Sequence, residues 1–125
     1  MIFKMRTSKN TMEKFEEIGA SENLQPFILS KIAISLSLKS GLPLTDEEFN
    51  TDNEGLELNR QTITGEFDRL YKCLIENFHG KHIDEDEYLT KYLKAHLDRG
   101  ANMVYSEFRY SRDLLLQLVK QDDSI

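Results

Sequence analysis

Four residues in one short segment could bind a metal ion. His79, His82, Asp84 and Glu85 all lie in the segment H-G-K-H-I-D-E-D. Imidazole and carboxylate groups at this spacing can coordinate a divalent metal. The acids also come just before a helical pattern, where carboxylates stabilise a helix N-terminus without any metal. We therefore expect no metal and no other cofactor.

Two other reactive side chains, His96 and Cys73, lie within helical patterns. His96 falls on an apolar stripe, where a hydrogen-bonded core histidine is more common than a general base. Lys72 could lower the pKa of the Cys73 thiol, but the neighbouring core positions favour a small buried hydrophobic residue. The sequence has no phosphate-binding glycine loop and no nucleophile elbow. We expect no catalytic residues, and a protein that is not an enzyme.

Basic side chains are concentrated near the start of a chain whose net charge is −6. Residues 1–43 carry six basic and four acidic residues, whereas residues 44–57 hold six acids and no base. Such asymmetry permits a basic face on an acidic protein, although a solvated surface of uneven charge would have the same composition. The candidate DNA-binding residues are Lys4, Arg6, Lys9, Lys14, Lys31 and Arg60.

The totals are those of one globular domain over residues 1–125. Apolar residues make up 39% of the sequence and charged residues 30%, which is ordinary for such a domain. No stretch approaches the roughly 20 apolar residues that cross a membrane. The start lacks the apolar run of a signal peptide, and the single Cys73 cannot form an internal disulfide. We expect a cytoplasmic protein without membrane contact.

The first part, residues 1–41, has the pattern of a strand and two helices. I-F-K-M-R-T alternates apolar and polar residues, which predicts a short strand with Lys4 and Arg6 on one face. Ser8 is a predicted N-cap of a helix ending at Gly19, and a second helix starts near Pro26. This order resembles ribbon-helix-helix proteins, whose paired strands enter the major groove. The alternative is an edge strand that its charges keep soluble.

The second part, residues 60–120, is helical by pattern. An acidic loop over residues 44–58, with a helical turn at 46–49, precedes it. A third helix is expected over about 64–78 and a fourth from Asp84 to Gly100, followed by one or two more. The apolar stripe of the third helix comprises Ile63, Phe67, Leu70, Tyr71, Leu74 and Phe78. The fold class is therefore mainly α, with four to six helices and a short N-terminal strand.

Three stretches are distinctive when taken together: P-F-I-L-S-K-I-A-I-S-L-S-L at 26–38, G-L-E-L-N-R-Q-T-I-T-G-E-F-D at 55–68, and H-L-D-R-G at 96–100. They resemble the DndE-type proteins of bacterial DNA phosphorothioation, and the Glu-x-Asn-Arg-x-Thr-x-x-Gly-Glu core of the second is the most specific. Locally, we expect Asn59, Arg60 and Glu66 to fix a helix start by hydrogen bonds and ion pairs. The alternative makes Arg60 a phosphate contact.

The resemblance implies a small helical protein that assembles as a homotetramer and binds DNA, preferentially nicked duplex. It also implies partner proteins of the phosphorothioation system, which carry the desulfurase, iron–sulfur and ATPase chemistry, so Cys73 receives no role. One departure is the turn between the first two helices. Many relatives have glycine there, near the tetramer interface, whereas S-E-N-L-Q-P at 21–26 has none. The packing of the subunits in the tetramer can therefore differ from that in those relatives.

Three functions remain as hypotheses. The leading one is a DNA-binding accessory subunit that uses basic surface residues of an oligomer. The second is a structural adaptor that holds the modification enzymes through the acidic loop and the apolar second helix. The third is a transcriptional regulator of ribbon-helix-helix type. A fourth, a DNA-nicking enzyme, has no candidate catalytic cluster in the sequence.

Overall fold

The computed structural model describes residues 2–123, and the side chains of residues 2–112. The elements are β1 (Lys4–Arg6), α1 (Lys9–Glu22), α2 (Pro26–Ser40), α3 (Asp46–Phe49), β2 (Glu57–Asn59), α4 (Arg60–Ile63), η1 (Gly65–Phe67), α5 (Asp68–His79), α6 (Glu85–Glu87), η2 (Tyr88–Leu93) and α7 (Lys94–Asp123). The expectation of a mainly helical protein with a short N-terminal strand is confirmed. The helical turn expected at 46–49 is α3, and Thr45 forms its capping box with Glu48.

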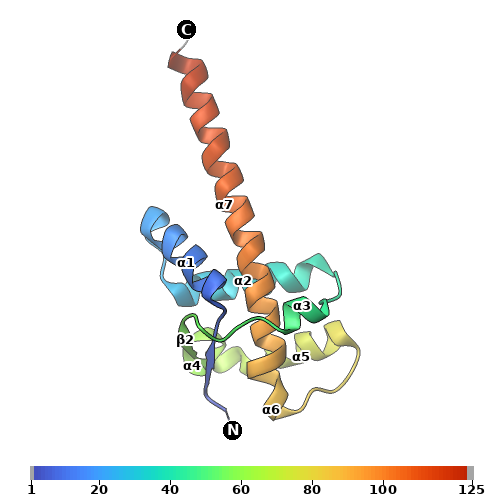
Figure 1. Cartoon of the computed structure of the whole chain (residues 1–125). Coiled ribbons are helices and arrows are strands. Elements are labelled where there is room, and N and C mark those ends of the chain that lie inside the picture. The colour runs from blue at the N-terminus through green and yellow to red at the C-terminus, as the bar shows by residue number, and fades with distance from the viewer. Residues whose placement is uncertain (1, 124–125) are drawn as a thin grey trace.

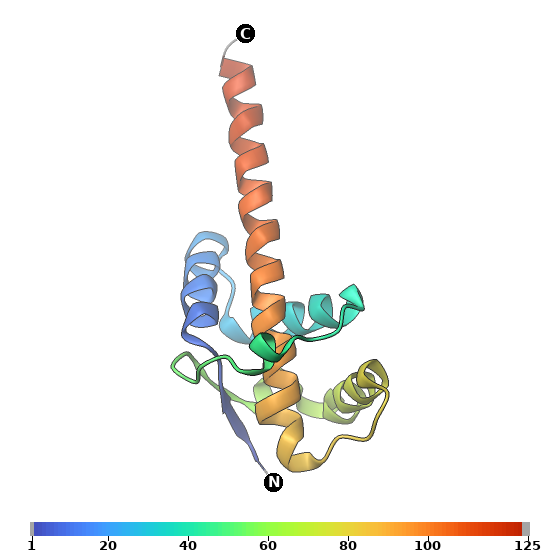
Figure 2. The same cartoon turned by 45° about the vertical axis from the view of Figure 1, so that its right-hand side comes forward.

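The long helix α7 is the axis of the molecule. Its first half runs through the middle of the other elements, and its second half extends well beyond them (Figures 1 and 2). Residues 92–101 are all buried, because Leu93, Leu97 and Ala101 face the hydrophobic core and the other elements, among them α1, α2 and α3, pack around the helix. The core therefore surrounds the first part of α7.

The expected helix end at Gly100 is wrong, because α7 continues through this residue. A Cβ at Gly100 would lie 1.7 Å from the carbonyl oxygen of Ala33 in α2. Glycine is thus needed here for the close approach of two helix backbones, not to end a helix. The crossing helix α2 buries Leu29, Ala33 and Ile34 completely or nearly so.

The two strands pair within the chain. β1 and β2 are antiparallel, and Lys4, Met5 and Arg6 lie opposite Asn59, Leu58 and Glu57. β2 was not expected, because its three residues lie in a segment read as a loop. In ribbon-helix-helix proteins the ribbon joins two subunits, whereas here β1 finds its partner in the same chain.

In the turn between α1 and α2, an asparagine adopts the left-handed conformation for which glycine is usually used. Asn23 has φ 55° and ψ 44°, a left-handed conformation that ends α1, and asparagine adopts it more readily than most residues. α1 therefore ends at Glu22 and not, as expected, at Gly19. Gly19 lies inside the helix, where a Cβ would be 2.9 Å from the carbonyl oxygen of Leu24.

The third helix differs most from its expected form. It is preceded by α4 and η1, and α5 itself begins at Asp68. Phe67, Leu70 and Leu74, expected in the core, are 57%, 55% and 46% exposed. The reason is that Asp68 turns inward to an ion pair, and Ile75 lies two turns further along the same face. Cys73, expected to be buried, is exposed for the same reason.

Candidate nucleic-acid interface

The two basic side chains of β1 lie on one exposed face. Lys4 and Arg6 are exposed, while Met5 between them is buried in the core. Both line a shallow hollow of the surface together with Asn53, Thr90 and one acidic residue, Glu57. One guanidinium nitrogen of Arg6 donates a hydrogen bond of 3.3 Å to the carbonyl oxygen of Gly55. The remaining donors of both residues are available to an anionic ligand.

The other basic candidates lie on α1 and α2. Lys9 is exposed at the first position of α1, and its backbone N–H donates to the Asp52 carboxylate over 2.8 Å. Lys14 contacts the side-chain oxygen of Asn102 in α7, and its ammonium lies 5.0 Å from the ring centre of Tyr105.

Lys31 is exposed on α2 and lies 5.6 Å from the ring centre of Phe27. The chain thus brings Lys4 and Arg6 together on one strand, with Lys9 at the start of the next element. Lys14 and Lys31 lie on two different helices.

Arg60 is in different surroundings from the other candidates. It is only 6% exposed. Its Nε donates to one carboxylate oxygen of Asp68 over 3.0 Å, and its Nη2 donates to the other over 2.5 Å and to Glu85 over 3.0 Å. Its Nη1 donates to the carbonyl oxygen of Ile2 over 3.2 Å, and its guanidinium lies 5.1 Å from the ring centre of Tyr88. Such bidentate pairing is among the strongest that arginine makes.

Titration of this cluster follows from its contacts. The hydrogen bond to Asp68 raises the pKa of Arg60 further above its usual value. Burial raises the pKa of the Asp68 carboxyl, but hydrogen bonds from Arg60 and Thr64 outweigh burial, so the pKa of Asp68 is lowered. Both groups are therefore ionised at neutral pH. The predicted structural role of Arg60, as an ion pair at the helix start, is confirmed.

The other two residues of that prediction behave differently from each other. The side chain of Asn59 accepts a hydrogen bond of 2.9 Å from the backbone N–H of Gln61, so it caps α4 as expected. Glu66 is exposed. The carboxylates that pair with Arg60 belong to Asp68 and Glu85 in its place.

Sequence reasoning missed a second buried cluster, centred on Asp98. Its Oδ1 accepts from the Ser8 backbone N–H over 3.1 Å and from the Thr11 hydroxyl over 2.7 Å. Its Oδ2 accepts from the Thr51 hydroxyl over 2.6 Å and from the Lys94 ammonium over 2.7 Å. Asp98 thereby fixes the junction of β1 and α1, next to Lys9. The available signal was the stretch H-L-D-R-G, which places the charged Asp98 and Arg99 directly after the apolar stripe of a predicted helix.

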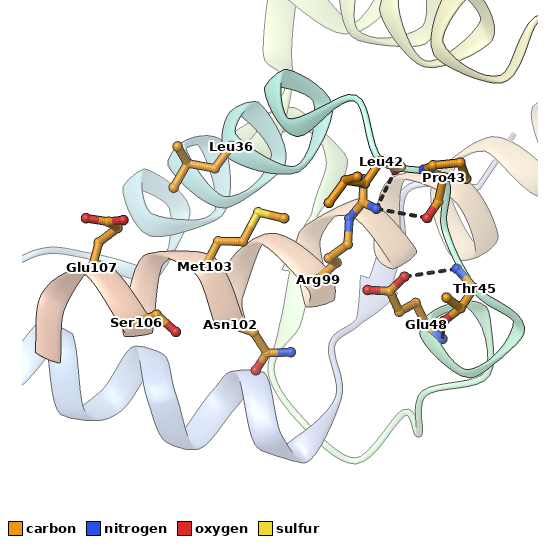
Figure 3. Close-up of a pocket in the computed structure, with 10 residues that line it drawn as sticks. All are labelled: Leu36, Leu42, Pro43, Thr45, Glu48, Arg99, Asn102, Met103, Ser106 and Glu107. Carbon is orange, nitrogen blue, oxygen red and sulfur yellow. Dashed lines mark hydrogen bonds between the residues drawn. The ribbon is translucent and has the colours of Figure 1, made fainter. Parts of the chain in front are cut away.

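Arg99, the next residue of H-L-D-R-G, holds the other side of α7. Its Nε donates to the Ser37 hydroxyl over 2.8 Å, and its Nη1 to the carbonyl oxygen of Leu42 over 2.6 Å. Figure 3 shows this side chain at the edge of a groove of about 800 Å³, with its bonds to Leu42 and Pro43 drawn. Arg99 therefore closes the end of α2, and its charge is not presented to solvent.

His96 is a core residue, as expected. It is 0% exposed, and its Nδ1 lies 2.8 Å from the Ser37 hydroxyl. Burial, together with smaller contributions from His79 and Arg99, lowers its pKa to about 3. His79 turns inward to meet His96, whereas His82 is exposed and lies 2.8 Å from Glu76.

Among the side chains of residues 2–112, no group of three or more His, Cys, Asp and Glu residues is placed to hold a metal. None of the helices within residues 2–123 is both long and apolar enough to span a membrane.

Comparisons with known proteins agree with this architecture. The family described as DNA sulphur modification protein DndE matches residues 4–112. The crystal structure of DndE from Escherichia coli B7A, described as involved in DNA phosphorothioation modification, is 20% identical and has a TM-score of 0.68. The match covers 83% of this chain and 97% of the Escherichia coli DndE chain.

A second crystal structure, of a DndE double glycine-to-lysine variant, is 18% identical with a TM-score of 0.65. It covers 82% of this chain and 97% of its own. Among curated proteins, no significant match is found. Because the family match spans most of the sequence, the chain belongs to the DndE family of DNA sulphur modification proteins.

Proposed function

We propose that the chain is a DNA-binding accessory subunit of bacterial DNA phosphorothioation, without catalytic activity of its own. It binds duplex DNA, preferentially nicked, through basic side chains presented by an oligomer, and it works beside the other proteins of the system. Membership of the DndE family supports the place in this system. The main support for DNA binding is the exposed pair Lys4 and Arg6 on β1. This strand pairs with β2, and the backbone just after it is bonded to Asp98.

The strand is fixed by three contacts that do not consume its charges. Its residues pair with β2, Met5 is buried, and Asp98 holds the backbone of Ser8 just beyond. A rigid backbone lowers the entropy lost when exposed side chains bind phosphates. Lys9 extends this surface by one basic group. We define the basic edge as Lys4, Arg6 and Lys9.

An oligomer multiplies the few contacts that one copy can make. Each basic edge carries three cations, and phosphate contacts from several copies act together because the later ones form within the same complex. Two features of the single chain support self-association. Ile28 and Ile32 on α2 are 37% and 40% exposed. A groove of about 560 Å³ between α1, α2 and α7 is lined by apolar side chains that include Leu24 and Phe108.

The test replaces the basic edge by alanine in one triple variant, Lys4→Ala, Arg6→Ala and Lys9→Ala. Fluorescence anisotropy with a nicked duplex, at several salt concentrations, measures affinity and its salt dependence. We expect affinity to fall at least about tenfold, with a slope of log K against log salt flatter by about 0.9 per lost phosphate contact. An intact duplex of the same sequence tests the preference for a nick.

A matched triple variant controls for the loss of positive charge itself. Lys39, Arg69 and Lys81 are exposed basic residues outside the basic edge, and their replacement by alanine removes the same formal charge. If both triple variants lose the same affinity, binding follows net charge and the basic edge is not the contact surface. Unchanged affinity and slope in the first variant would likewise reject it.

A structural adaptor is the second candidate, because the chain exposes a row of large apolar side chains. Phe67, Leu70 and Leu74 lie outward on η1 and α5, and such rows occur at protein interfaces. Co-purification with the modification enzymes that survives high salt and nuclease treatment would favour this function, if the isolated protein also lacks DNA affinity. Preference for one operator over random duplex would instead favour a regulator.

A further inference from the structure

Two histidine rings meet where the end of α5 reaches the buried part of α7. His79 is the last residue of α5, and its Nε2 lies 3.0 Å from the Nε2 of His96 in α7. The other ring nitrogen of His96 lies 2.8 Å from the hydroxyl of Ser37 in α2. His96 is fully buried, whereas His79 is partly exposed. One hydrogen bond between imidazoles therefore joins the end of α5 to the two central helices.

The hydrogen bond from Arg99 bears on where the hydrogens lie in this row of contacts. The Nε of Arg99 can only donate, and it donates to the Ser37 hydroxyl over 2.8 Å. The Ser37 hydroxyl can then donate its own hydrogen to Nδ1 of His96, 2.8 Å away. We assign this direction, in which the single N–H of neutral His96 lies on Nε2 and donates to Nε2 of His79. In this arrangement both rings are neutral and one proton lies between them.

The surroundings oppose a second proton. Rings of Phe78 and Tyr92 pack at centre distances of 4.8 Å from His96 and 4.9 Å from His79, respectively. The charges nearest the pair are Arg99 of α7 and Lys81 of the segment after α5, and both are positive.

The remaining elements around the pair contribute little compensating charge. α3 contributes the ring of Phe49 at 6.1 Å from that of His79, and also Glu48, whose carboxylate acts on Arg99. Burial is the largest cause of the lowered pKa of both histidines. The positive neighbours add to it.

We propose that the His79–His96 pair is a proton-operated latch, closed at neutral pH and released when His79 takes up a proton. With that proton, both facing nitrogens carry hydrogen and neither can accept, so the bond across 3.0 Å is lost. His79 is partly exposed and can turn to solvent as an imidazolium, while Ser37 keeps His96 in place. Ile75 is the only fully buried residue of α5, and Phe78 packs against His96, so these two side chains keep the helix on the core while its last turn opens.

The direction of the pH dependence follows from linkage. In the open form His79 has the ordinary histidine pKa near 6.5, and in the closed form its pKa is lower. The open form therefore binds more protons, and acid favours it. The opening constant is lowest above about pH 6.5, and below that value it rises by at most about tenfold for each pH unit, until the pH reaches the lowered pKa of His79 in the closed form.

Hydrogen exchange followed by mass spectrometry on the full chain tests the latch. The protein is compared at pH 7.5 and 5.5, with rates corrected for the intrinsic pH dependence of exchange. We expect opening of residues 75–84 to increase by up to about tenfold, with a smaller change in residues 92–101. The variant His79→Gln should lose this increase, because an amide can bond to His96 but does not titrate. His82→Gln is the matched control, and should behave as the unmodified protein.

Three outcomes would overturn the latch. The first is an equal response of the unmodified protein and His79→Gln. The second is acceleration spread evenly over the chain, which would indicate global acid unfolding. The third does not depend on any variant folding: nitrogen-15 NMR of the unmodified protein could show His79 titrating near pH 6.5 without a change in the His96 resonances.

Discussion

Arg6 and Arg60 lie at the ends of the two strands of the same small sheet, but their surroundings are opposite. Arg6 closes β1, is exposed, and makes a single hydrogen bond of 3.3 Å to a carbonyl oxygen. Arg60 follows β2 directly, is 6% exposed, and is bonded to two carboxylates. A count of basic residues treats them alike. Only the arginine whose donors are available can gain much from a phosphate, so availability separates a DNA contact from a structural cation.

The largest effect is expected for Asp98→Ala, which disturbs both sides of this comparison. Asp98 and Lys94 have side chains 3% and 6% exposed, so the substitution leaves a buried ammonium without its carboxylate. Breaking such a pair costs about 3–5 kcal/mol. DNA affinity should fall as well, because Ser8 and the start of α1 lose their anchor. Urea unfolding and anisotropy measure the two effects, and a stable variant would remove Asp98 from the argument.

Arg60→Ala comes next, with a loss of stability of about 2–3 kcal/mol. The loss is smaller because the side chains of Asp68 and Glu85 are 24% and 44% exposed and water can solvate them. Affinity of the folded protein for nicked duplex should stay within about twofold, since the charge is not presented to DNA. If Arg60→Ala keeps its stability but loses affinity, Arg60 is a DNA contact and not a structural cation.

Arg6→Ala should show the mirror image of Arg60→Ala. An exposed substitution of this kind changes stability by no more than about 0.5 kcal/mol. Loss of one phosphate contact per copy should nevertheless lower affinity for nicked duplex, and flatten the salt slope by about 0.9 for each copy engaged. Lys39→Ala, at an exposed lysine of α2, is the single-residue control. Equal salt slopes for Arg6→Ala and the control would place the contact elsewhere.

The smallest effect is in the pH dependence of the Arg60 cluster. Because the pKa of Asp68 is lowered in the folded protein, its contribution to stability is fully present above its unfolded pKa of about 4. It is lost as the pH falls below that value. The difference in unfolding free energy between the unmodified protein and Arg60→Ala should therefore shrink between pH 5 and 3. The acid effect of His96 is common to both proteins and cancels.

Several elements could be predicted because their signals are local. Ser8 caps α1 through its own side chain, Pro26 begins α2, and the short helical turn expected at 46–49 is present as α3. Lys4 and Arg6 alternate with an apolar residue and are exposed, as the period of a strand requires. Neighbouring residues decide each of these features, so the order of the sequence is enough to find them.

Other features could not be predicted because distant residues decide them. β2 exists through its pairing with β1, and Cys73 is exposed because Asp68, five residues earlier, turns α5 toward Arg60. Gly100 ends a helix by local rules, yet α7 passes through it where Ala33 approaches. Which face of a helix is buried, and where two backbones come close, depends on distant packing partners that the local sequence does not reveal.

The sequence by itself determined the family, the mainly helical class and the basic residues of the first strand. It also identified Arg60 and H-L-D-R-G as distinctive without revealing their partners. Only the tertiary structure decided that Arg60, Asp98 and Arg99 are buried in internal bonds, while Lys4 and Arg6 remain exposed. The physical reason is that a charge becomes structural or available according to the carboxylates and carbonyls that folding brings beside it.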